Sequence, residues 1–228
     1  DAVLDHAWRR GPRTGARRRV LVVGVERPGR LMPALRTELE SSRHEVTVAT
    51  SAAGGRGKFE NINALLAEHD LADFDWVLVV DDDVEVPHGF LDRFLAVAEQ
   101  HDLQLAQPAH RLASHAGWAV TRRRPASVAR ATAFVEIGPI TAFSREAARA
   151  LLPFPELRMG WGLDVHWSAV AQERGWRIGV VDATTILHTV PVAETYPRDA
   201  AVAEARAFLA TRPYVPRDEA NRTLRTHR

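Results

Sequence analysis

The feature that most constrains the fold is an alternation of short apolar strands and amphipathic helices in the first half of the chain. Apolar, largely β-branched residues fill positions 20–25 and 76–80, a pattern typical of strands buried on both faces of a sheet. A further strand is expected at residues 45–49. Helices with one apolar side are expected at residues 32–41 and 59–68. This βαβ spacing predicts an α/β fold with a doubly wound, mostly parallel sheet flanked by helices.

The second half of the chain is less regular. The expected strands cover residues 133–137, 140–143, 177–181 and 185–188. One helix is expected to begin at Pro87, and three more are expected at residues 145–152, 163–173 and 198–211. A chain of 228 residues suits one such domain. We predict a single domain at residues 20–212 that divides into a nucleotide-binding half (20–106) and an acceptor half (107–212). A basic flexible arm (1–19) precedes it and an exposed tail (213–228) follows it.

Composition excludes several classes of protein. A formal net charge of +1 gives no reason to expect nucleic acid as a partner. The chain has no cysteine, so a metal ion would have to be held by carboxylates, imidazoles or backbone oxygens. No apolar run is long enough for an integral membrane segment, and a cytoplasmic location is therefore expected. Because the chain begins with Asp1, an upstream segment and peripheral attachment to a membrane remain compatible with the sequence.

Three adjacent carboxylates, Asp81, Asp82 and Asp83, directly follow the buried strand 76–80. Ligands of doubly wound sheets bind at the carboxyl ends of the strands, which is where these carboxylates are placed. In an extended segment Asp81 and Asp83 point to the same side, so that one can ligate a hard cation such as Mn²⁺ or Mg²⁺ while the other meets a ribose or a metal-bound water. The alternative is a solvated acidic turn before a helix.

Four further residues have candidate roles in the chemistry of this site. Trp161 offers a flat face for a sugar ring, and Asp164, just before a helix, is a candidate general base; core packing and helix capping are the alternatives. His188 could complete a carboxylate-bound metal site, although a single histidine after a strand is often structural. Lys58 follows a glycine-rich loop at a helix N-terminus and could reach a diphosphate, or could be an ordinary surface lysine.

The order of these segments resembles that of the glycosyltransferase A fold, especially the family 2-like glycosyltransferases. The resemblance rests on Gly57, Lys58, Asn61, residues 77–83, Pro87, Phe90 and Leu91, and then on residues 134–137, 143–145, 160–164, 179–183 and His188. The later segments are also similar to a plant-type family of unknown function that is itself glycosyltransferase-like. The likeness covers roughly residues 20–188.

The resemblance implies a hexosyltransferase-like enzyme that uses Mn²⁺ or Mg²⁺ and a nucleotide-diphosphate-sugar donor, with UDP-sugar favoured. It implies that Asp164 is the base and that Asp83, Asp81 and His188 bind the metal. The nucleotide-sugar residues would be Val25, Glu26, Thr50, Lys58, Asp81, Asp82 and Trp161. The acceptor would be a carbohydrate or another hydroxyl compound. A single candidate base favours inversion at the anomeric carbon.

Two other functions are compatible with the same residues. A non-catalytic module that binds nucleotide-sugars or carbohydrates would keep this pocket and lack turnover. A haloacid-dehalogenase-like phosphatase also uses an Asp-x-Asp pair after a buried strand. In that family, however, the pair opens the domain and a hydroxyl residue follows, whereas here Asp81 follows the third strand and Glu85 takes the place of the hydroxyl.

Overall fold

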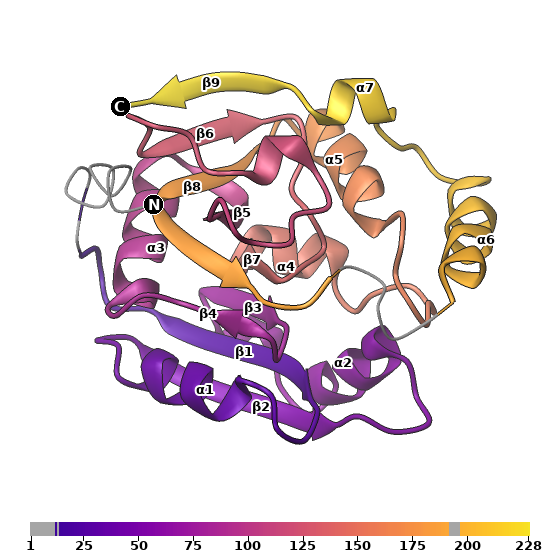
Figure 1. Cartoon of the computed structure of the whole chain (residues 1–228), viewed down its shortest axis with the longest axis horizontal. Helices are drawn as coiled ribbons and strands as arrows, with labels where there is room; N and C mark the ends of the chain where they lie inside the picture. Colours follow the sequence, from indigo (N-terminus) through magenta and orange to yellow (C-terminus); the bar gives the residue numbers. More distant parts are fainter. Residues whose placement is uncertain (1–11, 13, 192–196) are drawn as a thin grey trace.

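The computed structural model describes residues 12, 14–191 and 197–228. Within these residues a nine-stranded sheet has the order β2-β1-β3-β7-β5-β8-β6-β9, and β4 pairs separately with β8. In Figure 1 the sheet extends from β2 at the bottom to β9 at the top. The pairings give β2, β1, β3, β5, β8 and β9 one direction, and β7, β6 and β4 the opposite one. The predicted α/β fold with a mostly parallel sheet is therefore confirmed.

The first half follows the expected alternation closely. Its elements are β1 (Arg19–Glu26), α1 (Met32–Glu40), β2 (Glu45–Ala52), α2 (Lys58–Leu66), a 3₁₀ turn (Leu71–Asp73) and β3 (Trp76–Val80). Strand β1 lies between two parallel neighbours, β2 and β3. The side chains of residues 20–23 are completely buried, as expected for a strand covered on both faces.

The second half contains most of the irregular chain. Its elements are β4 (Val84–Glu85), α3 (Phe90–Gln100), β5 (Leu103–His110), a 3₁₀ turn (Ala119–Thr121), β6 (Ala129–Thr132), β7 (Ile140–Ser144), α4 (Arg145–Leu151), α5 (Leu163–Glu173), β8 (Arg177–His188), α6 (Arg198–Leu209), α7 (Arg217–Ala220) and β9 (Thr223–His227). None of the helices in the described part of the chain is long and apolar enough to cross a membrane.

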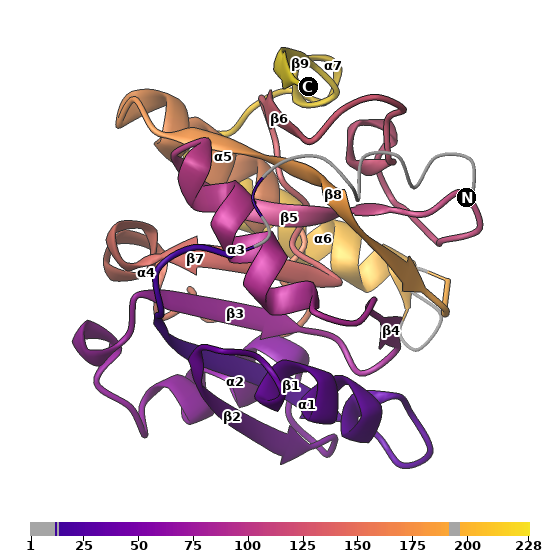
Figure 2. The ribbon, with the colours of Figure 1, turned by 90° about the vertical axis from the view of Figure 1, so that its left-hand side faces the viewer.

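Two apolar layers cover the faces of the sheet. Val20 and Val22 of β1 pack in one core cluster with α1 and α3, while Leu21 and Val23 pack in the other with α2, α4 and α5. Successive residues of a strand point to opposite faces, so one strand contributes to both layers. Helices α1 and α3 lie on the face turned to the viewer in Figure 2. The sheet is thus enclosed by helices on both sides.

Three expected elements differ from the structure. The strand expected at residues 133–137 is wrong: β6 ends at Thr132, and Phe134 and Val135 are apolar because they pack in two different core clusters. The helix expected from Pro87 begins at Phe90, because Gly89 adopts a left-handed conformation with φ of 68° before it. The two strands expected at residues 177–181 and 185–188 form one strand, β8, which continues without a break.

Residues 213–228, predicted as an exposed tail, are mostly exposed, but part of this segment joins the sheet. Strand β9 pairs antiparallel with β6 and extends the sheet by one strand. Val215 and Ala220 are buried against Val120 and Phe134, which supplies the apolar contact that holds this segment. The arm expected at residues 1–19 falls largely outside the described residues. The division into a nucleotide-binding and an acceptor half remains a prediction.

Candidate active site

A cavity of about 430 Å³ opens at the carboxyl ends of β1 and β3. Its wall combines residues from five segments: the end of β1 and the loop after it, the loop before α2, the acidic triplet, residues 136–139 and residues 158–161. His188 at the end of β8 completes it. The sequence therefore places the triplet correctly, since parallel strands present their carboxyl ends at one edge.

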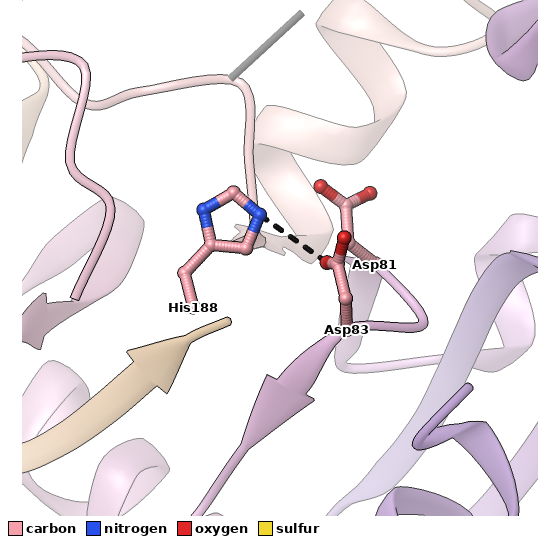
Figure 3. Close-up of side chains that lie close together, drawn as sticks. All are labelled: Asp81, Asp83 and His188. Carbon is pink, nitrogen blue, oxygen red and sulfur yellow. Dashed lines mark ion pairs between the residues drawn. The ribbon is translucent and has the colours of Figure 1, made fainter. Parts of the chain in front are cut away.

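Asp81, Asp83 and His188 come together at this edge, although His188 is more than 100 residues away in the chain. Each offers a ligand atom, and these atoms all lie within 4.8 Å of one another. Figure 3 shows the imidazole facing the two carboxylates, with Nε2 of His188 3.2 Å from Oδ1 of Asp83. Pairing of Val84 with His188 in the β4–β8 ladder fixes this approach. Tertiary structure thus assembles the predicted metal ligands.

The environment of His188 determines which ring nitrogen is available. Nδ1 lies 2.9 Å from the carbonyl oxygen of His115 and donates to it, which directs Nε2 toward Asp83. Burial lowers the pKa of His188, but the nearby Asp83 carboxylate and the hydrogen bond to the His115 carbonyl outweigh it, and the net pKa is raised. For Asp83, burial raises the pKa, and the nearby His188, Arg27 and Lys58 outweigh it and lower the pKa.

Asp82 is not a member of the cluster of Asp81, Asp83 and His188, and its carboxylate binds Arg27. The backbone N–H of Arg27 donates to Oδ2 of Asp82 at 2.7 Å, and Nε of the same residue lies 3.0 Å from that oxygen. Asp82 is 1% exposed, so this double contact satisfies a buried carboxylate. Arg27 also reaches Oδ2 of Asp83 at 3.2 Å. The nucleotide-binding role predicted for Asp82 remains a prediction.

Arg27 is a cavity residue that the sequence reasoning missed. It lies in the loop after β1, and nothing in its local sequence distinguishes it from other surface arginines. The feature that could have indicated a role at the site is the position of Arg27 directly after a buried strand that is parallel to β3. Residues at the carboxyl ends of adjacent parallel strands meet, which brings Arg27 to Asp82.

Lys58 lies in the cavity wall, as the metal and phosphate hypothesis requires. Its Nζ is 2.5 Å from Oδ1 of Asp81. Lys58 is the first residue of α2, so the free backbone N–H groups of that helix N-terminus lie beside it. Gly138 makes room for Asp81, because a Cβ at this position would lie 3.0 Å from Oδ2. This corner of the cavity is therefore suited to bind an anionic group beside a cation.

The three residues expected near the nucleoside separate into two groups. Val25 lies in the cavity wall. Glu26 and Thr50 lie on neighbouring parallel strands, with the Thr50 hydroxyl 3.3 Å from Oε2 of Glu26, and they are not part of that wall. The Thr50 hydroxyl also accepts a hydrogen bond from Arg36 at 2.8 Å. All three nevertheless stand at the carboxyl edge, and their predicted contact with a nucleoside stays a prediction.

Trp161 lines the cavity and is carried by a tightly fixed loop. The carboxylate of Glu204 on α6 accepts backbone hydrogen bonds from Arg158, Met159 and Gly160 at 2.7–2.9 Å. Gly160 has φ of 77°, and a Cβ there would come within 2.1 Å of the Phe59 ring. Glycine is therefore required at this position for the loop to pack on α2.

Asp164 lies at the start of α5 and is 7% exposed, and it is not part of the cavity wall. Its carboxylate oxygen Oδ1 accepts a hydrogen bond from the N–H of Val165 at 2.9 Å. Burial, with a smaller contribution from the charge of Glu136, raises the pKa of Asp164 to about 7. Glu136 is a second cavity residue that the sequence reasoning missed, because the predicted strand at 133–137 gave no reason to place it at the site.

The sequence matches the family model described as glycosyltransferase like family 2 over residues 15–208. The match covers most of the chain, including every residue of the site described above. The chain belongs to glycosyltransferase-like family 2. Membership supports glycosyl transfer from a nucleotide-sugar as the general class of activity, and it removes the reason for the phosphatase alternative. None of the curated proteins matches this sequence.

Three solved structures are similar to this family 2 member at low sequence identity, and the first of them shares its fold. A crystal structure of GalNAc-T7 with UDP, GalNAc and Mn²⁺ has 12% identity and a TM-score of 0.53, and the match covers 78% of this chain and 44% of that one. A structure of S. aureus TarS (residues 1–349) in complex with UDP-GlcNAc has 12% identity, a TM-score of 0.45 and coverages of 88% and 68%. The structure of A197 from STIV has 11% identity, a TM-score of 0.49 and coverages of 76% and 86%. This chain spans less than half of the GalNAc-T7 chain.

The donor atoms of this family 2 member fit a divalent cation. Two carboxylates and one imidazole are ligand types that divalent cations accept in proteins. Oδ1 of Asp83 is buried, and despite the nearby imidazole it has no hydrogen-bond partner of acceptable geometry among the described residues. A buried carboxylate oxygen without such a partner is costly unless a cation contacts it.

Proposed function

We propose that this protein is a metal-dependent glycosyltransferase that moves a sugar from a nucleotide-diphosphate-sugar, with UDP-sugar favoured, to an acceptor hydroxyl. The observation that carries the proposal is the meeting of Asp81, Asp83 and His188 with Lys58 in one cavity at the carboxyl edge of the sheet. Carboxylates that face a lysine and an imidazole form a site for a cation and a diphosphate together.

Mn²⁺ or Mg²⁺ would be held by Asp83, Asp81 and His188, and when bound it supplies positive charge against the leaving diphosphate. Lys58 adds a second positive charge at the same corner and turns from Asp81 to the phosphates. Trp161 provides the flat face against which the transferred sugar stacks. Val25, Glu26 and Thr50 stand where the first two strands end and are assigned to the nucleoside.

Asp164 is proposed as the general base of an inverting displacement. The acceptor O–H bond breaks and the proton passes to the Asp164 carboxylate. The acceptor oxygen bonds to the anomeric carbon from the face opposite the diphosphate, and the bond from that carbon to the phosphate oxygen breaks with its electron pair. A pKa of about 7 suits a base that must hold a proton during the step and release it afterwards. A product that keeps the donor's anomeric configuration would contradict inversion.

The test is thermal unfolding with UDP, GDP, CDP and ADP, each with and without Mn²⁺. A ligand that binds the folded state alone raises Tm, and at a concentration 100 times its Kd it adds roughly 2.7 kcal/mol of stability. We expect a rise with UDP that requires Mn²⁺ and is lost in Asp83→Ala. Asp218→Ala, an exposed aspartate on α7, is the matched control and should keep the rise. No rise with any of the four nucleotides would reject the nucleotide-sugar donor.

A second candidate function is a module that binds a nucleotide-sugar without transferring it. It is favoured by one observation, the absence of Asp164 from the cavity wall. Asp164→Asn distinguishes the two functions once a donor is known from the thermal measurement. If the protein is an enzyme, this variant keeps the UDP and Mn²⁺ response and loses transfer. Equal product formation by the variant and the wild type would remove Asp164 from the mechanism.

A further inference from the structure

His188, the candidate ligand from β8, makes three contacts with two consecutive residues, Ser114 and His115. Its backbone N–H donates to the Ser114 hydroxyl at 2.8 Å, and its backbone carbonyl accepts the N–H of His115 at 3.1 Å. Its ring Nδ1 donates to the carbonyl oxygen of His115 at 2.9 Å. These contacts leave Nε2 directed at the Asp83 carboxylate, as Figure 3 shows. The position of the ring therefore depends on where residues 114 and 115 lie.

Ser114 is the buried member of a loop between β5 and the 3₁₀ turn at residues 119–121. Its side chain is 4% exposed, whereas none of the other side chains of residues 111–117, all of which the structure describes, is buried. The core therefore holds no apolar side chain of this stretch. A buried hydroxyl is costly without hydrogen-bond partners, so the contacts of Ser114 determine where this part of the loop lies.

The start of the loop is paired with the sheet beside His188. Strands β5 and β8 are parallel neighbours, and His110 at the end of β5 pairs with Ile186 of β8. The N–H of Arg111 then donates to the carbonyl oxygen of Ile186 at 2.9 Å. The loop thus leaves β5 next to the last residues of β8, which brings Ser114 to the backbone of His188.

The Ser114 hydroxyl is itself oriented by a buried histidine. Its Oγ lies 2.8 Å from Nδ1 of His110, which is completely buried. On the other side of that ring, Nε2 lies 3.5 Å from Oε2 of Glu136. A carboxylate opposite Nε2 favours the tautomer with its proton there, which leaves Nδ1 as an acceptor. The Ser114 O–H then donates to Nδ1, and a lone pair of the same oxygen accepts the N–H of His188.

Glu136, at the far end of this chain of contacts, is fixed independently of His188. Its N–H donates to Oε1 of Gln107 at 2.5 Å, and its carbonyl oxygen accepts from the Thr141 hydroxyl at 2.8 Å. Gln107 and Thr141 are completely buried. Oε1 of Glu136 accepts the N–H of Gly117 at 3.1 Å, which joins it to the same loop. The core of the sheet therefore anchors the chain of contacts that ends at His188.

We propose that Ser114, oriented by His110 and Glu136, is a positioning residue that holds His188 with Nε2 toward a bound divalent cation. The proposal rests on the proposed function for the existence of the cation site. Partners that orient a metal-binding histidine typically change metal affinity by about 10–100-fold when they are removed. Ser114 acts through the backbone of the ligand, so we expect an effect at the lower end. A contact that stabilised the fold alone would lower Tm and leave the affinity for metal unchanged.

The first test measures Mn²⁺ binding without nucleotide, from the EPR signal of the free ion. We expect Ser114→Ala to raise the Kd for Mn²⁺ about tenfold, and Ser114→Thr, which keeps the hydroxyl, to restore most of the affinity. The matched control is Ser127→Ala, which also removes a buried hydroxyl. That hydroxyl donates to the carbonyl oxygen of Ala129 at 3.3 Å and lies outside the cavity wall. Equal Mn²⁺ affinity in Ser114→Ala and in the wild type would overturn the proposal.

The second test needs no metal. Long-range ¹H–¹⁵N NMR spectra of the imidazole rings at pH 9 report which ring nitrogen carries the proton, and the His188 signals are assigned by their loss in His188→Gln. We expect the wild type to show the proton on Nδ1, and Ser114→Ala to show a mixture of the two tautomers. A proton on Nε2 in the wild type, or a wild-type spectrum in Ser114→Ala, would overturn the proposal.

The two tests separate this proposal from the proposed function. Failure of the wild type to bind Mn²⁺ would reject the metal site of the proposed function, and the ring spectra would still decide whether Ser114 positions His188. If Ser114→Ala does not fold, His110→Phe removes the acceptor of the Ser114 hydroxyl and should also weaken Mn²⁺ binding. Unchanged Mn²⁺ affinity in His110→Phe would count against the proposal.

With an active donor and acceptor, the same variant divides affinity from chemistry. We expect Ser114→Ala to raise the Mn²⁺ concentration for half-maximal rate by the same factor as the Kd, and to keep kcat near the wild-type value at saturating Mn²⁺. A lower kcat with an unchanged Mn²⁺ requirement would indicate a general structural defect and would overturn the positioning role.

Discussion

The two walls of the cavity are built in different ways. On the donor side, Asp81, Lys58 and Arg27 stand at the ends of regular strands or at the start of a helix. On the acceptor side, the part of the wall supplied by the predicted acceptor half, Glu136 stands on an irregular segment held by hydrogen bonds to Gln107 and Thr141. The comparison teaches that a shared sheet edge sets the donor wall, whereas the acceptor wall depends on individual contacts.

The buried pair of Arg130 and Asp182 is the clearest example of such an individual contact. Both side chains are completely buried and joined at 2.7 Å. Arg130 also donates to the carbonyl oxygens of Val120 and Arg122, and Asp182 accepts the N–H of Arg124. This one pair thus fixes the loop beyond Thr121 against β8.

The largest effect should come from the donor wall. Asp83→Ala removes a metal ligand, and we expect kcat/KM to fall by about a thousandfold, because charge stabilisation by a metal contributes several kcal/mol. Steady-state kinetics over a range of Mn²⁺ concentrations gives the measurement. Asp218→Ala is the control. Activity restored to the wild-type level at high Mn²⁺ would show that Asp83 tunes affinity and does not support the chemical step.

The next effect should come from the buried pair of Arg130 and Asp182, which lies outside the cavity wall, and should appear in stability. Arg130→Met leaves the Asp182 carboxylate buried and without its ion pair, so we expect the free energy of unfolding to fall by about 3–5 kcal/mol. Urea denaturation measures it. Arg145→Met is the control, since Arg145 pairs with Asp75 at a partly exposed site and exposed pairs contribute about 0–1 kcal/mol. Similar losses of unfolding free energy in both variants would show that the buried pair contributes no more to stability than the partly exposed one.

The third prediction concerns pH. The folded-state pKa of Asp164 is raised to about 7, above the unfolded value of about 3.9. The folded state then binds one more proton between those values. The stability that the raised pKa of Asp164 contributes is complete below about pH 4 and is lost as the pH rises through about 7. The difference in unfolding free energy between the wild type and Asp164→Asn should therefore fall by about 1.4 kcal/mol per pH unit in this window. A flat difference would show that the Asp164 pKa is not raised.

The smallest effect is expected for the sugar-stacking face. Trp161→Ala should raise the donor-sugar KM about fivefold, because a stacking contact contributes about 1 kcal/mol beyond burial. UDP itself should bind with unchanged affinity, which calorimetry can measure. Trp176→Ala, whose ring lies beside Arg174 outside the cavity, is the control. Weaker binding of UDP by Trp161→Ala would place this residue against the nucleotide and not the sugar.

Much of the donor wall could be predicted from sequence. Residues 20–25 and 76–80 are apolar enough to require burial on both faces, and this places their carboxyl ends, and hence Asp81 and Asp83, at one edge. The family relationship was also predicted from the order of the motifs, and the family match confirms it. Arg27 could not be predicted, because its role depends on which strand lies beside β1.

The second half of the chain was harder to predict from sequence for a physical reason. Phe134 and Val135 give a strand-like apolar pattern, yet they serve two separate core clusters and belong to no strand. The tail after Pro213 carries too few apolar residues to predict a strand, and it joins the sheet because β6 offers an unpaired edge. Local pattern does not report such long-range pairings.

The sequence by itself determined the class of fold, the strand that ends in the acidic triplet and the set of candidate ligands, because periodicity and burial are local properties of the chain. Tertiary structure alone decided that His188 meets Asp83, that Arg27 binds Asp82 and that Glu136 lines the same cavity. Each of these contacts joins residues far apart in the chain. Their free energy depends on distance and burial, which no short stretch of sequence contains.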